Sequence, residues 1–407
     1  MKQGWEVRKL GDVCELINRG VSPKYTETDG LIVLNQKCIR NHEVNYELAR
    51  THDSKVKPVS HEKLIQIGDV LINSTGTGTL GRVAQIRDEP NHATVDSHIT
   101  IVRPLANVFY NDFFGYALIL IEEEIAKRGE GCGGQTELAR STLKNEFNIS
   151  YPKSLPEQQR IVAILDEAFA AITQAKANAE QNLRNAKELF ESYLQSVFEN
   201  KGEGWEEKSL KEVCAKITDG THQTPKYFDD GVIFLSSKNV TSGKIDWNNI
   251  KYIDEKQHLE MHKRVAPKVG DILLAKNGTT GVAAMVDRDL VFDIYVSLAH
   301  IRVLDEVTPN FMLYFINSPA AKKQFNKRLK GIGVPNLHLE EIREVEISFP
   351  KSKDEQNILV QKLDALSTET KQLETIYQQK INDLDELKKS ILQKAFAGEL
   401  NTTALEV

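Results

Sequence analysis

The sequence predicts an α+β protein with two tandem globular domains, each with a twisted, mostly antiparallel sheet, joined by two long antiparallel coiled-coil helices with pseudo-two-fold symmetry. Three observations predict this class. The chain repeats itself internally, a long amphipathic pattern follows each copy, and short β-like runs separated by turn residues fill the copies.

The internal repeat is the strongest signal. Residues 5–20 align without gaps on residues 205–220, and Trp, Leu, Val, Cys, Ile and Gly recur at the same places. Residues 68–71 (Gly-Asp-Val-Leu) match residues 270–273 (Gly-Asp-Ile-Leu), and both lead into loops rich in glycine and threonine. The copies share spacing but differ in loop residues, so we expect one scaffold with two different surfaces.

Each copy alternates short β-like runs with loops of Gly, Asn, Ser and Thr, which is typical of strands joined by tight turns. The expected strands are 31–34, 70–72, 82–86 and 98–102 in the first copy, and 232–235, 272–275, 282–286 and 300–303 in the second. Helical stretches are expected near 113–127 and 311–330. This mixture indicates an α+β domain.

A helix start signal follows each copy. Ser154-x-x-Glu157 and Ser352-x-x-Glu355 both fit a capping box, in which the serine oxygen accepts a backbone N–H and the glutamate reaches back. Apolar residues then recur in steps of four and three, with the same stutter in both helices, which predicts a coiled-coil seam. Each pattern spans about 43 residues, a helix of roughly 65 Å.

The simplest partner for each helix is the other one. In the order domain, helix, domain, helix, an antiparallel pair leaves one domain at each end, whereas a parallel pair would require the second domain to travel back along the helix. We therefore expect domains at residues 1–153 and 201–351 and spacer helices at residues 154–200 and 352–407.

Composition indicates an ordinary soluble globular protein. The 407 residues are 40% hydrophobic and 7% aromatic, and no run approaches the roughly 18 apolar residues that a membrane span needs. We therefore expect a cytoplasmic protein with no membrane partner. The four cysteines form no Cys-x-x-Cys pair, so neither a disulfide framework nor a metal site is expected. The net charge of −6 falls mainly on the helices and does not exclude a basic face on either domain.

No motif supports an enzyme. Residues 76–81 match Gly-x-Gly-x-x-Gly, but the next residues read as a strand instead of the crossover helix that a dinucleotide fold requires. There is no Walker lysine, no His/Cys ligand spacing, no recognisable nucleophile paired with a base, and no methyltransferase tetrapeptide. Cys14, Cys214, His98 and His300 are better explained as structural residues. We therefore predict a non-catalytic chain with no metal and no cofactor.

The loop residues instead suit contact with nucleic acid. Glycine lets a hairpin tip approach a phosphate backbone, and hydroxyl, amide and ammonium groups donate to phosphates or base edges. In the first copy the candidates are Arg19, Ser22, Lys24, Tyr25, Asn35, Gln36, Lys37, Arg40, Asn73, Ser74, Thr75, Thr77 and Thr79. In the second they are Thr221, His222, Gln223, Lys226, Tyr227, Ser236, Ser237, Lys238, Asn239, Lys276, Asn277, Thr279 and Thr280. A base contact, a phosphate contact and a solvated turn stay open for each of them.

Together these features resemble the specificity subunit of type I restriction-modification systems. They are the Trp-x4-Leu opening, the Gly-Asp-Val/Ile-Leu strand, the Pro-Lys-x-x-x-Glu-Gln sequence before each helix, and residues 395–400 (Ala-Phe-Ala-Gly-Glu-Leu). The resemblance covers essentially the whole chain. It implies two target-recognition domains, each reading one half of a split, asymmetric site in double-stranded DNA, with the helices fixing the gap.

The resemblance also implies partners. Two methyltransferase subunits would bind the helices and neighbouring surfaces, and restriction subunits would join outside them. S-adenosylmethionine, ATP and magnesium would belong to those partners. Half-sites roughly 34–36 Å apart fit a rigid helical spacer. Two alternatives stay open: a coiled-coil scaffold without a DNA role, and a standalone DNA-modifying enzyme, which needs a cofactor site that the sequence does not show.

Overall fold

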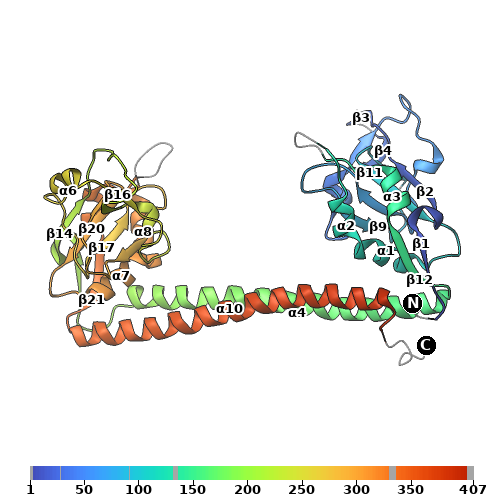
Figure 1. The fold of residues 1–407 in the computed structure, drawn as a ribbon. Coiled ribbons are helices and arrows are strands. Elements are labelled where there is room, and N and C mark those ends of the chain that lie inside the picture. The colour runs from blue at the N-terminus through green and yellow to red at the C-terminus, as the bar shows by residue number, and fades with distance from the viewer. Residues whose placement is uncertain (1–2, 28, 91, 132–135, 330–335, 401–407) are drawn as a thin grey trace. The chain divides into compact units, whose positions relative to one another are not determined.

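The computed structural model describes residues 3–27, 29–90, 92–131, 136–329 and 336–400. They form two compact units (Figure 1): residues up to Asn178 with those from Lys380 onward, and residues from Ala179 to Gln379. Each unit therefore contains one globular domain and one part of each long helix.

The central sheet of the first domain is antiparallel, with the strand order β2-β11-β8-β9. Its strands are β2 (Cys14–Arg19), β8 (Val70–Asn73), β9 (Val83–Gln85) and β11 (Ile99–Pro104). Residues 70–72 are all apolar because both faces of this sheet are buried. Val70 and Ile72 belong to a core shared with the helices, whereas Leu71 belongs to a second core.

The second core of this domain lies between the central sheet and a smaller mixed sheet, with the order β10-β4-β7-β3. The smaller sheet contains β3 (Tyr25–Thr26), β4 (Leu31–Leu34), β7 (Arg50–His52) and β10 (Ala93–Val95). Strand β4 is parallel to β10 and antiparallel to β7. Two smaller pairings complete the domain: β1 (Trp5–Lys9) with β12 (Asn148–Pro152), and β5 (Ile39–Arg40) with β6 (Glu43–Val44).

The second domain repeats this arrangement. Its central antiparallel sheet has the order β14-β20-β17-β18, its mixed sheet has the order β16-β15-β19, and β13 pairs with β21. The strands are β13 (Trp205–Ser209), β14 (Cys214–Asp219), β15 (Val232–Leu235), β16 (Lys251–Ile253), β17 (Ile272–Ala275), β18 (Ala283–Met285), β19 (Phe292–Ile294), β20 (Leu298–Val303) and β21 (Glu346–Pro350). The prediction of mostly antiparallel sheets is confirmed; the parallel pairs β4–β10 and β15–β19 are the difference.

Short helices cover the sheets. They are α1 (Asn111–Leu120), α2 (Glu122–Lys127), α3 (Arg140–Glu146), α5 (Leu210–Val213), α6 (Glu255–Met261), α7 (Pro309–Asn317), α8 (Pro319–Arg328) and α9 (Leu339–Arg343), with 3-10 turns η1 (Leu10–Asp12), η2 (Gln36–Cys38), η3 (Tyr46–Leu48), η4 (His61–Lys63) and η5 (Ser237–Asn239). The stretch predicted near 311–330 is two helices, because Ser318 accepts a hydrogen bond from Ala321 N and Pro319 begins the second helix.

The two long helices are α4 (Leu155–Glu199) and α10 (Lys353–Ala397), each of 45 residues. The serine half of each capping box is present: Ser154 Oγ accepts from Glu157 N at 3.4 Å, and Ser352 Oγ accepts from Glu355 N at 3.5 Å. No helix in the described ranges is long and apolar enough to cross a membrane.

Within the first unit the long helices run antiparallel. Lys176 Nζ binds Asp385 at 2.7 Å, and Lys388 Nζ lies 5.0 Å from the ring centroid of Phe169. Residue numbers on α10 therefore rise as those on α4 fall. The contact between Lys388 and Phe169 also explains why a lysine lies among the apolar residues of α10 that face α4. Its aliphatic stem and its ammonium group cover the aromatic ring.

The second unit shows the same direction of packing. Leu194, Val197 and Phe198, near the end of α4, share one core with Val360 and Leu363, near the start of α10. The antiparallel helix pair predicted from the chain order is confirmed within each unit.

Two side-chain contacts anchor the start of each long helix to its domain. Gln158 accepts a hydrogen bond from Tyr110 N and donates to the backbone oxygens of Val108 and Pro152, and it is fully buried. Gln356 makes the corresponding three contacts with Thr308, Glu306 and Pro350. The Glu-Gln pair of the sequence motif is thus explained by the glutamine, which satisfies three backbone groups at once.

Candidate DNA interface

The close approach of two backbone segments positions the first candidate segment of each domain. A Cβ at Gly20 would lie 2.0 Å from the Val95 oxygen, and one at Gly220 would lie 1.9 Å from the Ile294 oxygen. Only glycine fits there, which explains why this residue ends the matched openings of the two copies. The chain then leaves the central sheet and runs into the segments that carry Tyr25 and Tyr227.

An exposed tyrosine beneath a cation occurs in both domains. The Arg50 guanidinium lies 3.4 Å from the ring centroid of Tyr25, and Lys251 Nζ lies 3.9 Å from that of Tyr227. The two cations occupy the same place, as the first residues of β7 and β16. The tyrosine side chains are 43% and 40% exposed. We call these the tyrosine–cation pairs, Tyr25–Arg50 and Tyr227–Lys251.

Sequence reasoning found the tyrosines but not their cations. Arg50 and Lys251 lie on strands well beyond the candidate segments. The β3–β7 pairing brings Arg50 near Tyr25, and the bridge between Phe228 and Tyr252 brings Lys251 near Tyr227. The sequence did offer one signal for Arg50 and Lys251: each is a basic residue at the start of a short strand, at the same place in both copies. Lys57 and Lys63 were also missed; they donate to the backbone oxygens of Ser22 and Gly20.

The hairpin loops predicted between strands 70–72 and 82–86, and between 272–275 and 282–286, are confirmed, because β8 pairs with β9 and β17 with β18. In the first domain this loop contacts two other candidate residues. Gln36 Nε2 donates to Thr75 O at 2.5 Å and to Thr75 Oγ1 at 2.6 Å, and Asn73 Nδ2 donates to Gln36 O. The structure therefore brings the hairpin loop and the turn η2 together.

Four candidates lie beneath the surface and are left out of the interface proposed below. Asn73 and Ser74 are fully buried, and Ser74 Oγ bonds Thr100 and the Ile72 oxygen. Asn239 holds the backbone around η5 through Ser236 N and Asn249 O. Lys276 is 6% exposed, and its ammonium binds Asp219 at 2.6 Å. Their side chains bond other groups inside the domain, which supports the loops; the exception is Asn73 Oδ1, which is buried without a hydrogen-bond partner.

The remaining candidates differ in exposure. Exposed residues are Ser22, Lys24, Tyr25, Lys37, Arg40 and Thr77 in the first domain, and His222, Gln223, Lys226, Tyr227, Lys238 and Thr279 in the second. Half-buried residues are Arg19, Asn35, Gln36, Thr75 and Thr79, and Thr221, Ser236, Ser237, Asn277 and Thr280. Arg40 belongs to the β5–β6 hairpin, whose turn is tied to α2 by His42 and Glu122 at 2.6 Å.

The two domains hold opposite charges at one matched position. In the first, Arg19 of β2 donates to the Ser97 and Leu138 oxygens and pairs with Glu137 at 3.0 Å. In the second, the matching residue is Asp219, which binds Lys276 and Arg264, both at 2.6 Å. Burial raises the pKa of Asp219, but hydrogen bonds from Lys276 and Arg264 outweigh it, so the pKa lies below its usual value.

Another pair of carboxylates explains the Gly-Asp motif. Asp69 binds Arg103 at 2.7 Å in the first domain, and Asp271 binds Arg302 at 2.6 Å and His300 at 2.7 Å in the second. Burial raises the pKa of Asp69. Burial acts in the same direction on Asp271, but hydrogen bonds from His300 and Arg302 outweigh it, and the pKa of Asp271 falls to about 2. The motif is structural: it joins β8 to β11, and β17 to β20.

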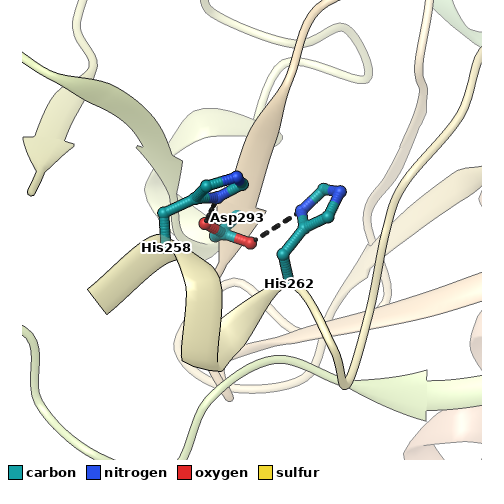
Figure 2. A group of neighbouring side chains, drawn as sticks. All are labelled: His258, His262 and Asp293. Carbon is teal, nitrogen blue, oxygen red and sulfur yellow. Dashed lines mark hydrogen bonds and ion pairs between the residues drawn. The ribbon is translucent and has the colours of Figure 1, made fainter. Parts of the chain in front are cut away.

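One group within the described ranges has the geometry of metal ligands: His258, His262 and Asp293, in the second domain (Figure 2). Sequence reasoning expected no metal and missed this group. The available signal was the His-x-x-x-His spacing of residues 258–262; the third ligand comes from β19, which is distant in sequence.

Comparison with known proteins decides the family. Residues 2–181 and 202–383 match the family described as the type I restriction modification DNA specificity domain. The chain belongs to this specificity family. The two matches cover most of the chain, one match for each copy of the repeat, and the chain is a type I restriction-modification specificity subunit whose paired domains fit recognition of a bipartite target.

Relatives of known name or structure agree with this family. The chain is 24% identical over 308 residues to the type I restriction enzyme MjaVIII specificity subunit of Methanocaldococcus jannaschii, covering 71% of this chain and 70% of the relative. A structure from a study of assembly and conformational transition of the type I R-M system matches with a TM-score of 0.76 at 18% identity, covering 98% of this chain and 99% of that one. The HsdS subunit of Thermoanaerobacter tengcongensis matches with a TM-score of 0.62 at 18% identity, covering 98% of both chains. These two structures share the fold.

Proposed function

We propose that each domain of this specificity subunit reads one half of a split, asymmetric site in double-stranded DNA through the surface around its tyrosine–cation pair. The observation that carries the proposal is that the pair recurs at the same strand position in both domains while its neighbours differ. A shared contact suits the DNA backbone, which is the same everywhere, and unlike neighbours suit unlike bases.

The chemistry of the exposed candidates supports this surface. Lys24 and Arg50 in the first domain, and Lys226 and Lys251 in the second, supply cations for phosphates. Amide side chains such as Gln36 and Gln223 can donate and accept together, as reading of an adenine edge requires. A net charge of −6 for the chain does not oppose this, because screening limits each charge to roughly 8–10 Å at physiological salt.

We propose functional boundaries at residues 1–153 and 201–351 for the recognition domains and at 154–200 and 352–407 for the spacer helices. The paired helices then set the gap between half-sites. The antiparallel packing within each unit supports this role, because matched apolar stripes hold the two helices in register.

We further infer that two methyltransferase subunits bind the long helices and neighbouring surfaces, with restriction subunits outside them. Exposed apolar side chains on α4 and α10 support docking: Leu189, Ile358, Ile376 and Leu387 are 47–58% exposed. In this assembly the chain is not catalytic, the cofactors belong to the partners, and the complex works in the cytoplasm where its DNA lies.

The experiment is a methylation map of DNA in cells that carry the methyltransferase subunit with variants of this chain. We expect Tyr25→Ala and Arg50→Ala to alter recognition of one half-site only, and Tyr227→Ala and Lys251→Ala to alter the other. Loss of a contact of this kind weakens binding by about tenfold. Arg8→Ala, which removes an exposed cation on β1, is the matched control.

Gel shifts of the methyltransferase-bound chain test the alternative of a coiled-coil scaffold without a DNA role. The proposal predicts specific binding that weakens steeply with salt. Absence of specific binding would favour the scaffold. Equal effects of both tyrosine–cation pairs on the same half-site would refute the assignment of one domain to each half.

A further inference from the structure

We infer that the second domain binds a divalent transition-metal ion, of the zinc class, through His258, His262 and Asp293. In Figure 2 the two imidazoles converge on one carboxylate. His258 Nδ1 lies 2.7 Å from Asp293 Oδ2, and His262 Nδ1 lies 3.1 Å from Asp293 Oδ1. The three ligand atoms all lie within 4.8 Å of one another.

The local fold builds this arrangement from two elements. His258 lies in α6 and His262 is its C-cap residue, still in the α-helical region, so the spacing of four places both rings on one side of the helix. Asp293 is the central residue of β19, which pairs with β15 at the edge of the mixed sheet, and its neighbours Phe292 and Ile294 are buried. The helix and the strand thus present two nitrogens and one oxygen, a donor set that suits zinc.

The burial of the three side chains favours an ion over an ordinary surface pair. The Asp293 side chain is 1% exposed, so its charge requires compensation. His258 is 15% exposed and His262 is 31% exposed, which leaves a path from solvent and room for water as a further ligand. Without an ion, both imidazoles must carry a proton on Nδ1 to donate to the carboxylate. An ion replaces both protons and neutralises the carboxylate at once.

An ion would require the ligand atoms to move apart. Zinc holds nitrogen and oxygen ligands at about 2.0–2.2 Å, which places neighbouring ligand atoms roughly 3.3 Å apart in a tetrahedral site. The two nitrogen–oxygen distances, 2.7 and 3.1 Å, are shorter than this value and go to different oxygens of Asp293.

The first domain offers an internal comparison. Thr94 occupies the place of Asp293 in the parallel strand pair, since β10 corresponds to β19, and its hydroxyl donates to the Lys63 oxygen. In the first domain the 3-10 turn η4 precedes β8, as α6 precedes β17 in the second domain. This turn contains a single histidine, His61. Among the residues that the structure describes, the metal-ligand geometry therefore occurs in one copy of a shared scaffold, so the scaffold itself does not require it.

The site would fix α6 beneath the segment that carries Tyr227. Gln257 of α6 accepts from Lys226 N and donates to Lys226 O, and Arg264, just past the helix, binds Asp219. An ion that joins α6 to β19 would therefore also hold in place the segment that carries Lys226 and Tyr227. The site is structural in role, because its ligands serve to join two elements.

The test measures zinc binding to the full chain, purified without a histidine tag, dialysed and free of DNA. We expect one equivalent of zinc, a rise in Tm with added zinc, and a cobalt absorption spectrum typical of nitrogen and oxygen ligands. His258→Ala and His262→Ala should each weaken zinc binding at least about tenfold, since even substitutions behind a ligand cost about that much. His61→Ala, in the first domain, is the matched control and should bind as the unmodified chain does.

Asp293→Asn changes a buried residue and can fail to fold for that reason alone. His262 is 31% exposed, so His262→Ala tests the same site in a chain that should fold. Failure of the chain to bind zinc at one equivalent would overturn the inference. So would zinc binding that is unchanged in both His258→Ala and His262→Ala. Because no DNA is present, either outcome leaves the proposal of DNA recognition standing.

Discussion

The buried ion pair between Asp69 and Arg103 gives a quantitative prediction. The Arg103 side chain is 11% exposed and that of Asp69 is 1% exposed. In Arg103→Ala the carboxylate keeps one backbone hydrogen bond, from Gln66 N, and loses both contacts to the guanidinium. Removal of one partner of a buried pair costs about 3–5 kcal/mol.

Protonation limits this loss. An aspartate with an unfolded pKa near 3.9 takes up a proton at pH 7 for about 4 kcal/mol, so the first domain should lose roughly 3–4 kcal/mol at pH 7. Burial already raises the pKa of Asp69 in the native chain, and loss of the arginine raises it further. The folded variant then binds more protons than the unfolded chain above about pH 4. Its free energy of unfolding therefore falls as pH rises, and its deficit shrinks on acidification.

Hydrogen exchange with mass spectrometry measures this change in the intact chain. Peptides from β8 and β11 should exchange faster in Arg103→Ala, whereas those from β17 and β20 in the second domain report any general effect. Arg8→Ala is the control: its pair with Glu6 lies at the surface, so its loss should leave exchange in β8 and β11 unchanged. A loss below about 1 kcal/mol in Arg103→Ala, or a deficit that grows on acidification, would refute the reasoning.

Three further predictions follow from other contacts. Gln356→Ala leaves Thr308 N and two backbone oxygens without their partner, so we expect a loss of about 2–4 kcal/mol, seen as faster exchange at the start of α10 and not of α4. Burial raises the pKa of the Cys214 thiol to about 12, so iodoacetamide at pH 8 should modify it only in unfolded chain; rapid modification of folded chain would contradict its burial. Insertion of one heptad into both α4 and α10 lengthens each helix by about 10.5 Å, the length of about three base pairs. Methylation maps should then show a longer gap between unchanged half-sites. An unchanged gap would exclude a spacer role.

Much of the architecture could be predicted because it depends on patterns local in sequence. Residues 31–34, 232–235 and 272–275 are strands as expected, since short apolar runs bounded by turn residues leave little choice. The antiparallel helix pair followed from chain order and two matching stripes. The break at Ser318-Pro319 was missed because the stretch was judged by its apolar content and not by its capping signals.

The candidate interface was less predictable, because its contacts join distant parts of the chain. Composition alone could not separate Lys276, which is buried on Asp219, from Lys226, which is exposed. Both lie in polar loops: Lys226 follows Gly220, and Lys276 directly follows β17. Likewise, Arg50 and Asp293 meet their partners only in the folded domain, since the tyrosine in one case and two histidines in the other come from segments distant in sequence.

The opposite charges of Arg19 and Asp219 affect how new specificities could arise. Residue 276 occupies the place of Ser74, so a graft of the second hairpin loop into the first domain would set its lysine beside Arg19, where the second domain has Asp219. Grafting the loop together with residues 214–227 would carry Asp219 along. Exchange of a whole domain would keep Asp219 and Lys276 together, whereas exchange of the single loop would separate them. We therefore expect a whole-domain exchange to disturb the fold less than a single-loop exchange.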